Sequence, residues 1–148
     1  MKEVKLGFEL AGVSKVICDN FRYSAEKLGI VSSYRPFLFF LANNKDGLSQ
    51  SDLVKLSHFK APTVSLTLQK MENDGLIRKE VDVVDQRITR IYLTEEGMKL
   101  DEKIKTIHKE VEENLSSLFN DEEKKTFLEY LERIKNNMSE GGNKNENI

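Results

Sequence analysis

The sequence predicts a mainly α-helical protein with one small β-hairpin: a winged helix-turn-helix flanked by N- and C-terminal dimerisation helices. Three observations support this fold class. Residues 1–32 carry a long apolar stripe of helical period. Two short amphipathic segments separated by a tight turn follow it. Two β-branched runs then surround a charged turn before further helical stretches begin.

Residues 1–32 have an apolar pattern with two faces. On the first face, apolar residues recur at intervals of three, four or seven: Leu6, Leu10, Val13, Ile17, Phe21 and Leu28. Ala11, Cys18 and Ala25 form a second stripe of small residues spaced by seven. An isolated surface helix needs only one apolar face. The segment is therefore predicted to be a dimerisation helix that is buried against a second copy of the chain.

Residues 33–94 are predicted to form the winged helix-turn-helix. The region starts with a short, strongly apolar helix from Ser33 that stops at the turn signal of residues 43–47. A helix of about two turns follows, and Ser49 is a suitable N-cap for it. A tight turn of about four residues separates this helix from the next one.

That next helix, at about 62–74, is the expected recognition helix. Pro62 fits its first turn, where the missing N–H costs nothing. Asp74–Gly75 ends it with a residue that tolerates a left-handed backbone. The inward stripe consists of Val64, Leu68 and Met71. Residues on the other side of the helix are left facing outward.

A β-hairpin, expected as the wing, covers about 77–94. Arg87 and Arg90 lie in or beside its turn, with almost nothing local to pair them. Thr94 is a possible N-cap for the long helix that follows, because Glu95 and Glu96 suit the positive end of a helix.

The C-terminal part, 95–138, is predicted to contain two more dimerisation helices. The second of them starts at Asn120, where Glu123 completes a capping-box pattern. Residues 139–148 are predicted to be a disordered tail.

Composition limits the classes of protein to consider. The chain has 148 residues, 32% of them charged, and a net charge of −2, which fits one domain or one compact domain with an extension. Residues 1–44, 45–94 and 95–148 carry +2, +1 and −5, so the acidity belongs to the C-terminal third. No apolar run approaches a membrane span, and the N-terminus lacks the apolar part of a signal peptide. A cytoplasmic protein without a membrane partner is therefore expected.

The residues of the hairpin resemble a known family. "DQRITRIYLTEEG", residues 85–97, is similar to the wing signature D-x-R-x-x-x-[IV]-x-L-T-x-x-G of the MarR (multiple antibiotic resistance regulator) family. Upstream, "LSQSDLVKLSHFKAPTVSLTLQKMENDGLI" resembles the helix-turn-helix of that family. The similarity runs from about Ser33 to Gly97. It implies a homodimeric transcription regulator, expected to be a repressor, that binds pseudo-palindromic double-stranded DNA and is often released by a small ligand or an oxidant.

The expected DNA contacts combine this resemblance with residue chemistry, since Ser, Thr and Gln bond base edges or phosphates and Lys supplies positive charge. They are Ser49, Gln50, Lys60, Ala61, Thr63, Ser65, Leu66, Gln69, Lys70, Asp85, Arg87 and Arg90.

Four of these contacts have particular roles or open alternatives. Arg87 is expected to enter a minor groove, where narrow A·T tracts concentrate negative potential. The resemblance suggests that Asp85 fixes the wing and the orientation of an arginine. Arg90 has either a structural role or a phosphate-binding one. Leu66 departs from the basic residue that is common in the family, and it is either a tolerated surface leucine or a contact with a thymine methyl group.

The sequence also bears on oxidant sensing, metal binding and catalysis. Cys18 could sense oxidants, with Arg22 and Lys15 near it and Asp19 adjacent, but it is more simply a small packing residue. His58 and His108 have no second ligand at a suitable spacing, so neither a metal nor another cofactor is expected. No nucleophile–base pairing or glycine-rich phosphate loop indicates an enzyme. A winged-helix protein-interaction module that does not bind DNA is the remaining alternative.

Aromatic residues crowd the first two predicted helices, and their spacing does not distinguish the core from an effector pocket. They are Phe8, Phe21, Tyr23, Tyr34, Phe37, Phe39 and Phe40.

Overall fold

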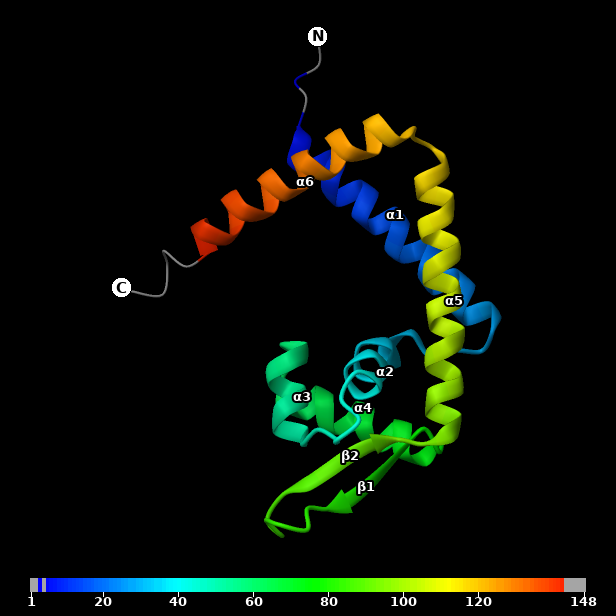
Figure 1. The fold of residues 1–148 in the computed structure, drawn as a ribbon, viewed down its shortest axis with the longest axis vertical. Helices are drawn as coiled ribbons and strands as arrows, with labels where there is room; N and C mark the ends of the chain where they lie inside the picture. Colours follow the sequence, from blue (N-terminus) through cyan, green and yellow to red (C-terminus); the bar gives the residue numbers. More distant parts are fainter. Residues whose placement is uncertain (1–2, 4, 143–148) are drawn as a thin grey trace. The chain divides into compact units, whose positions relative to one another are not determined.

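The computed structural model describes residue 3 and residues 5–142 of the chain. Its elements are α1 (Leu6–Lys27), η1 (Ser32–Tyr34), α2 (Arg35–Ala42), α3 (Gln50–Ser57), α4 (Ala61–Asn73), β1 (Ile77–Val81), β2 (Thr89–Leu93), α5 (Glu95–Ser117) and α6 (Asp121–Gly142). The chain divides into two units, residues 1–109 and residues 110–148. In the first unit, the β1–β2 hairpin projects from α2, α3 and α4 (Figure 1). The predicted fold class, mainly α with a small hairpin, is confirmed.

Local sequence signals set the ends of the helix-turn-helix pair. The Ser49 hydroxyl accepts a hydrogen bond from the Asp52 amide at 3.1 Å, and the Asp52 carboxylate accepts one from the Ser49 amide at 2.9 Å. This capping box satisfies two backbone donors at the start of α3. α3 ends at Ser57, and its C-cap residue His58 has a left-handed backbone with φ of 58°. Pro62 lies in the first turn of α4, and Gly75 (φ +74°) follows its end, as predicted.

One hydrophobic core joins helices from different parts of the first unit. α4 contributes Val64, Leu68 and Met71, all fully buried as predicted. The same core contains residues of α1, α2, α3, β2 and α5, among them Phe21, Ala25, Phe37, Leu38, Leu53, Ile91, Ile104 and Ile107. Parts of the expected dimerisation helices therefore also belong to the core of the winged helix.

The hairpin is antiparallel, with Ile77 opposite Leu93 and Val81 opposite Thr89. Leu48, just before α3, adds an isolated bridge to Ile91, which the sequence pattern did not predict. Thr94 caps α5 as expected, because its hydroxyl accepts a hydrogen bond from the Gly97 amide at 3.1 Å. The same hydroxyl donates to the Gly75 carbonyl oxygen at 2.5 Å, which ties the start of α5 to the end of α4.

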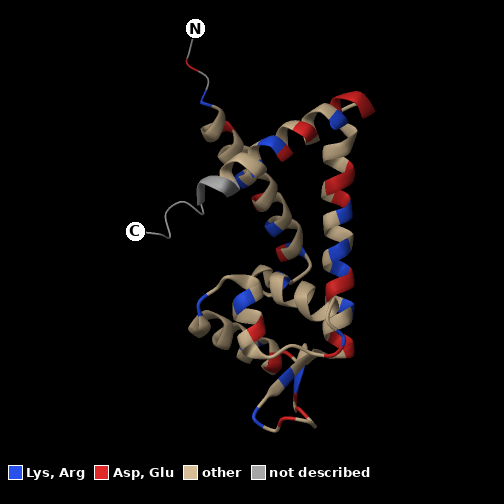
Figure 2. Cartoon of the chain, turned by 60° about the vertical axis from the view of Figure 1, so that its left-hand side comes forward, with Lys and Arg blue, Asp and Glu red and all other residues tan. Residues whose placement is uncertain are grey.

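The charged residues of α5 alternate in sign along the helix (Figure 2). Lys105 reaches the buried carboxylate of Asp101 at 2.9 Å, and Lys99 lies 3.6 Å from Glu95. These i,i+4 pairs stabilise an exposed helix face by only tenths of a kcal/mol. The other side of the helix supplies Ile104 and Ile107 to the core.

The second unit contains the end of α5 and α6. Asn120 and Glu123 form the predicted capping box, with both hydrogen bonds at 2.9 Å. The expected tail at 139–148 is partly wrong, because α6 continues to Gly142. Extending an existing helix costs far less than nucleating one, so residues of modest helix propensity can follow. Residues 143–148 lie outside the described part of the chain.

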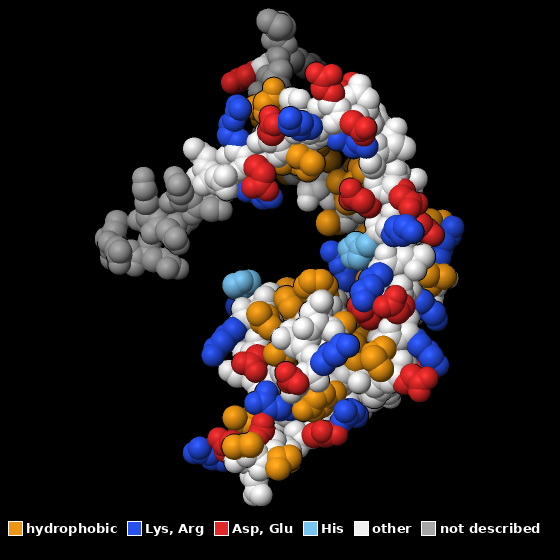
Figure 3. Space-filling model, in the orientation of Figure 1, with side chains coloured by type: hydrophobic (Ala, Val, Ile, Leu, Met, Phe, Trp, Pro, Cys, Tyr) orange, Lys and Arg blue, Asp and Glu red, His pale blue; other side chains and the backbone are white. Residues whose placement is uncertain are grey.

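Apolar side chains remain exposed on both units (Figure 3). On α1 they include Leu6, Phe8, Val13 and Val16, and on α6 Leu128, Ile134 and Met138. Among the described residues, no helix is both long enough and apolar enough to cross a membrane.

Candidate nucleic-acid interface

The outward side of α4 is the first part of the candidate interface. Because its buried residues lie on one stripe, the helix exposes the others. These exposed positions are Ala61, Pro62, Thr63, Ser65, Leu66, Gln69, Lys70, Glu72 and Asn73. Leu66 is 54% exposed, which is a large apolar exposure between polar neighbours. The side chains that could read base edges therefore have no competing contact with the core.

Residues at the start of α3 and α4 differ in how freely their side chains could contact DNA. Gln50 and Lys60 are exposed. Ser49 is only half-buried, but its hydroxyl oxygen already caps α3. A capped helix start also presents free backbone N–H groups, which suit phosphate oxygens.

Arg87 and Asp85 form a pair at the tip of the wing. The Asp85 carboxylate accepts hydrogen bonds from the Arg87 backbone amide at 3.1 Å and from its guanidinium at 3.1 and 3.2 Å. These bonds hold the pKa of Asp85 below its usual value, with the Arg87 side chain as the main cause. The Arg87 side chain is nevertheless 90% exposed. These contacts are compatible with the orienting role that the resemblance implies for Asp85.

Arg90 is held against the body of the winged helix. Its Nε atom donates to the Asp82 carboxylate at 2.5 Å, and Nη1 donates to the Gly47 carbonyl oxygen at 3.5 Å. Its side chain is 33% exposed, against 90% for Arg87. These contacts favour the structural alternative for Arg90. The expectation that both arginines lacked local partners is wrong, since each has a carboxylate within hydrogen-bonding distance.

Asp82 is a residue whose role sequence reasoning missed. Its carboxylate accepts from the amides of Val84 at 2.8 Å and Asp85 at 3.0 Å, besides binding Arg90. These contacts lower its pKa to about 2, with the Asp85 amide as the largest cause, followed by Arg90 and then the Val84 amide. The available signal was an Asp three residues before the Asp85–Gln86–Arg87 turn, but the partner of Asp82 across the hairpin depends on the loop length.

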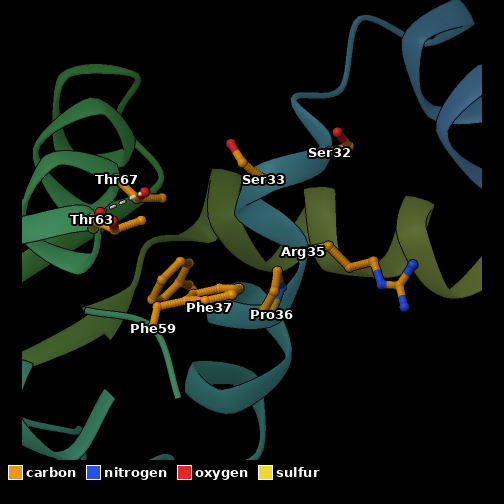
Figure 4. A pocket seen from close by; sticks show the side chains of 8 residues that line it. All are labelled: Ser32, Ser33, Arg35, Pro36, Phe37, Phe59, Thr63 and Thr67. Carbon is orange, nitrogen blue, oxygen red and sulfur yellow. Dashed lines mark hydrogen bonds between the residues drawn. The ribbon is translucent and has the colours of Figure 1, made fainter. Parts of the chain in front are cut away.

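A hollow of about 380 Å³ lies beside α4 (Figure 4). Thr63 and Thr67 line it from α4, and Ser32 and Ser33 face it from η1. Phe59 and Phe37 form an apolar wall, with ring centroids 6.0 Å apart. Thr63, expected at the flank of the DNA-facing side, therefore borders this hollow as well.

A second hollow, of about 490 Å³, lies between α2 and α5. It is lined by Arg35, Pro36, Phe39, Phe40, Asp101, Ile104, Lys105 and His108. The Arg35 guanidinium lies 4.4 Å from the Phe21 ring centroid, and Phe21 in turn lies 4.5 Å from the His108 ring. Desolvation and then the charge of Arg35 lower the pKa of His108. Of the crowded aromatic residues, Phe39 and Phe40 line this second hollow. Phe21, Tyr34 and Phe37 are buried in the core, and Phe37 also borders the first hollow.

Cys18 is exposed on α1 rather than packed. The two nearby cations are both engaged by Asp19, at 2.5 Å from Lys15 and 2.8 Å from Arg22. Within the described residues, no group of three or more His, Cys, Asp or Glu side chains could hold a metal ion.

Comparison with known proteins agrees with this arrangement. The sequence profile of the MarR family matches residues 29–88. The chain is 30% identical to the HTH-type transcriptional regulator YdgJ of Bacillus subtilis, over 93% of this chain and 82% of YdgJ. It is 29% identical to MepR in the crystal structure of an S. aureus MepR–DNA complex, with a TM-score of 0.77 over 91% of this chain and 99% of that one. S. aureus MepR bound to ethidium bromide matches at 29% identity and a TM-score of 0.65, over 93% of this chain and 99% of that one.

These relatives are transcriptional regulators, not enzymes, and MepR shares the fold over 91% of this chain. The chain belongs to the MarR family of winged helix-turn-helix transcriptional regulators.

Proposed function

We propose that this protein is a homodimeric repressor that binds a pseudo-palindromic operator and is released by a small ligand. In each subunit, α4 enters the major groove and the wing around Arg87 enters the neighbouring minor groove. The observation that carries this proposal is the pairing of an exposed polar row on α4 with a 90% exposed Arg87 on the same unit. A relative of the same fold, MepR, has been crystallised with DNA.

The residues on α4 fit distinct tasks at the DNA. Ser65 and Gln69 can bond base edges, because they are exposed and one turn apart on the same side. Lys60 and Lys70 lie at the two ends of the helix and suit the phosphate backbone. Leu66 lies beside Ser65 and suits a thymine methyl group. Two subunits would then read half-sites about one helical turn, ~34 Å, apart.

Dimerisation is supported by the apolar side chains that the single chain leaves exposed. Phe8 on α1 and Leu128 on α6 are 76% and 61% exposed. Exposed apolar surface of this extent marks an interface in a soluble protein. Sedimentation equilibrium of the purified chain should give twice the mass of 17.1 kDa. Phe8→Glu should shift the population toward the monomer, whereas the control Lys103→Glu on the exposed side of α5 should not. A wild-type monomer at micromolar concentration would contradict the proposed dimer.

Ligand release is supported by the hollow between α2 and α5, which has aromatic walls and carries the Asp101 carboxylate beside Arg35 and Lys105. Pockets of several hundred Å³ with few polar groups suit small aromatic molecules. Ethidium bromide, which binds MepR, is a direct probe. Its addition should weaken DNA binding by the wild type, and Phe39→Ala should reduce that response while leaving ligand-free DNA binding intact. An identical response in the variant would rule out this hollow.

DNA binding itself is tested by selecting duplexes from a random library with the purified protein and titrating the recovered sequence. The logarithm of the affinity should fall with the logarithm of the salt concentration, with a slope of about −0.9 per neutralised phosphate. Arg87→Ala should weaken binding by about 1–3 kcal/mol. Lys103→Ala is the matched control and should change affinity little. Failure of the wild type to enrich any sequence would favour an interaction module that does not bind DNA.

A further inference from the structure

The tip of the wing carries two adjacent apolar side chains that the fold does not use. Val83 and Val84 are 95% and 96% exposed, and no large hydrophobic side chain in the described part of the chain is more exposed. Single exposed apolar residues are ordinary on protein surfaces. Two neighbouring exposed valines at the end of a projecting hairpin are less ordinary, because an apolar hairpin end can bind other molecules.

Hydrogen bonds fix the backbone that presents these valines. Asp82 accepts from the Val84 and Asp85 amides at 2.8 and 3.0 Å. The Asp82 amide donates to the Ile88 carbonyl oxygen at 2.8 Å, and the Ile88 amide donates to the Asp85 carbonyl oxygen at 3.0 Å. A loop closed in this way loses little conformational entropy when it binds. The valines are therefore held ready for contact.

At the same tip, the acidic side chains are less exposed than the side chain of Arg87. The acidic side chains turn inward, with Asp82 14% and Asp85 36% exposed, while Arg87 is 90% exposed. Hydrophobic side chains lie beside cationic and acidic ones at the end of the hairpin (Figure 3). A partner meets an apolar surface beside the most exposed charge of the tip, the Arg87 guanidinium that is paired with Asp85.

A DNA minor groove offers the matching surface. Its walls are deoxyribose rings, its rims are phosphates, and apolar side chains of other proteins insert there. In A·T tracts the groove is narrow, and its floor lacks the amino group that guanine places in it. An apolar side chain can come close to an A·T floor, but against a G·C pair it would cover an unpaired donor.

We propose that Val83 and Val84 contact the walls and floor of the minor groove beside each half-site, so that the wing selects A·T-rich flanks. This inference rests on the proposed DNA binding and adds to it the residues that set the flank preference. Arg87 supplies attraction to the groove, and the valine pair adds selectivity between base pairs.

The experiment compares three versions of the selected duplex that differ only in the flanking base pairs: A·T, G·C and inosine·C. An inosine·C pair has the minor groove of A·T but a major groove like that of G·C. The wild type should bind A·T and inosine·C flanks about tenfold more tightly than G·C flanks, in line with the usual cost of one wrong base pair. In the double variant Val83→Ser/Val84→Ser this ratio should fall to about threefold, the part of the preference that Arg87 keeps through the negative potential of a narrow groove.

Val81→Ser, on the exposed side of β1 in the same hairpin, is the matched control and should keep the wild-type ratio. If the serine pair disturbs the wing, Val83→Thr/Val84→Thr keeps the side-chain shape and should give an intermediate ratio. An unchanged ratio in the double variant, inosine·C flanks behaving like G·C, or no flank preference in the wild type would each overturn the inference while leaving DNA binding intact. A wild type that selects no DNA at all would instead overturn the proposed function.

Discussion

The two parts of the molecule that are proposed to contact DNA, α4 and the wing, are positioned by different interactions. α4 is positioned by packing, because Val64, Leu68 and Met71 are fully buried and leave the outward side chains free. The tip of the wing has no buried apolar residue and is positioned by the carboxylates of Asp82 and Asp85. Packing is coupled to the stability of the whole unit, whereas surface hydrogen bonds are local. A substitution in the buried stripe of α4 should therefore destabilise the whole unit. A substitution at the tip should change only the conformation of the wing.

The largest effect should come from the packing of α4. Leu68→Ala should lower the free energy of unfolding by about 2–5 kcal/mol, because it leaves a cavity in a core position that is 0% exposed. Denaturant titration measures this value. The matched control Leu66→Ala, on the outward side of the same helix, should stay within about 0.5 kcal/mol of the wild type. Similar losses for both leucines would show that α4 is not fixed by one buried stripe.

The base of the wing is the next most sensitive position. At Gly97 an added Cβ would lie 2.1 Å from the Leu76 backbone carbonyl oxygen and 3.1 Å from the Leu93 side chain. Gly97→Ala should therefore cost about 1–3 kcal/mol of unfolding free energy, as overpacking does. Gly12→Ala on α1 has open space around it and should instead stabilise its helix by up to ~1 kcal/mol. Thermal unfolding of the two variants would show opposite shifts; a neutral Gly97→Ala would mean that the base of the wing can move apart.

One polar contact on α4 gives a smaller and more direct test. The buried Tyr34 hydroxyl donates to the Asp74 carboxylate at 2.7 Å, at the end of α4. Burial, and then Asp74, raise the pKa of Tyr34 to about 12, so the hydroxyl stays neutral up to high pH. Tyr34→Phe should cost about 1 kcal/mol of unfolding free energy, and Tyr23→Phe, 60% exposed, should cost almost nothing. A loss as large as that of Leu68→Ala would show that hydrogen bonding rather than packing positions the helix.

The difference between local spacing in α4 and longer-range contacts in the wing explains which features could be predicted from the sequence. The buried stripe of α4, the N-cap Ser49 and the Asn120–Glu123 capping box follow from local spacings of three or four residues, which the helix itself fixes. The Asp82–Arg90 pair and the Leu48–Ile91 bridge join residues eight and forty-three positions apart. Such contacts depend on hairpin register and loop length, which local patterns do not determine. Local patterns do not predict the exposure of Val83 and Val84 either, because apolar residues beside a strand usually extend it.

The smallest effect is expected at Asp82, where acid should loosen only the tip. Its folded-state pKa of about 2 lies below its usual value of 3.8, so its hydrogen bonds are fully present above pH 3.8 and are lost as the pH falls through about 2. The amide NMR signals of Val84 and Asp85 should shift with that midpoint, while those of Leu68 and Met71 report whether the core is intact. Asp82→Asn should move the two wing signals at neutral pH and leave the unfolding temperature nearly unchanged. A midpoint near 3.8 would show that the carboxylate is not engaged, and a matching loss of core signals would show that the wing and α4 are not held independently.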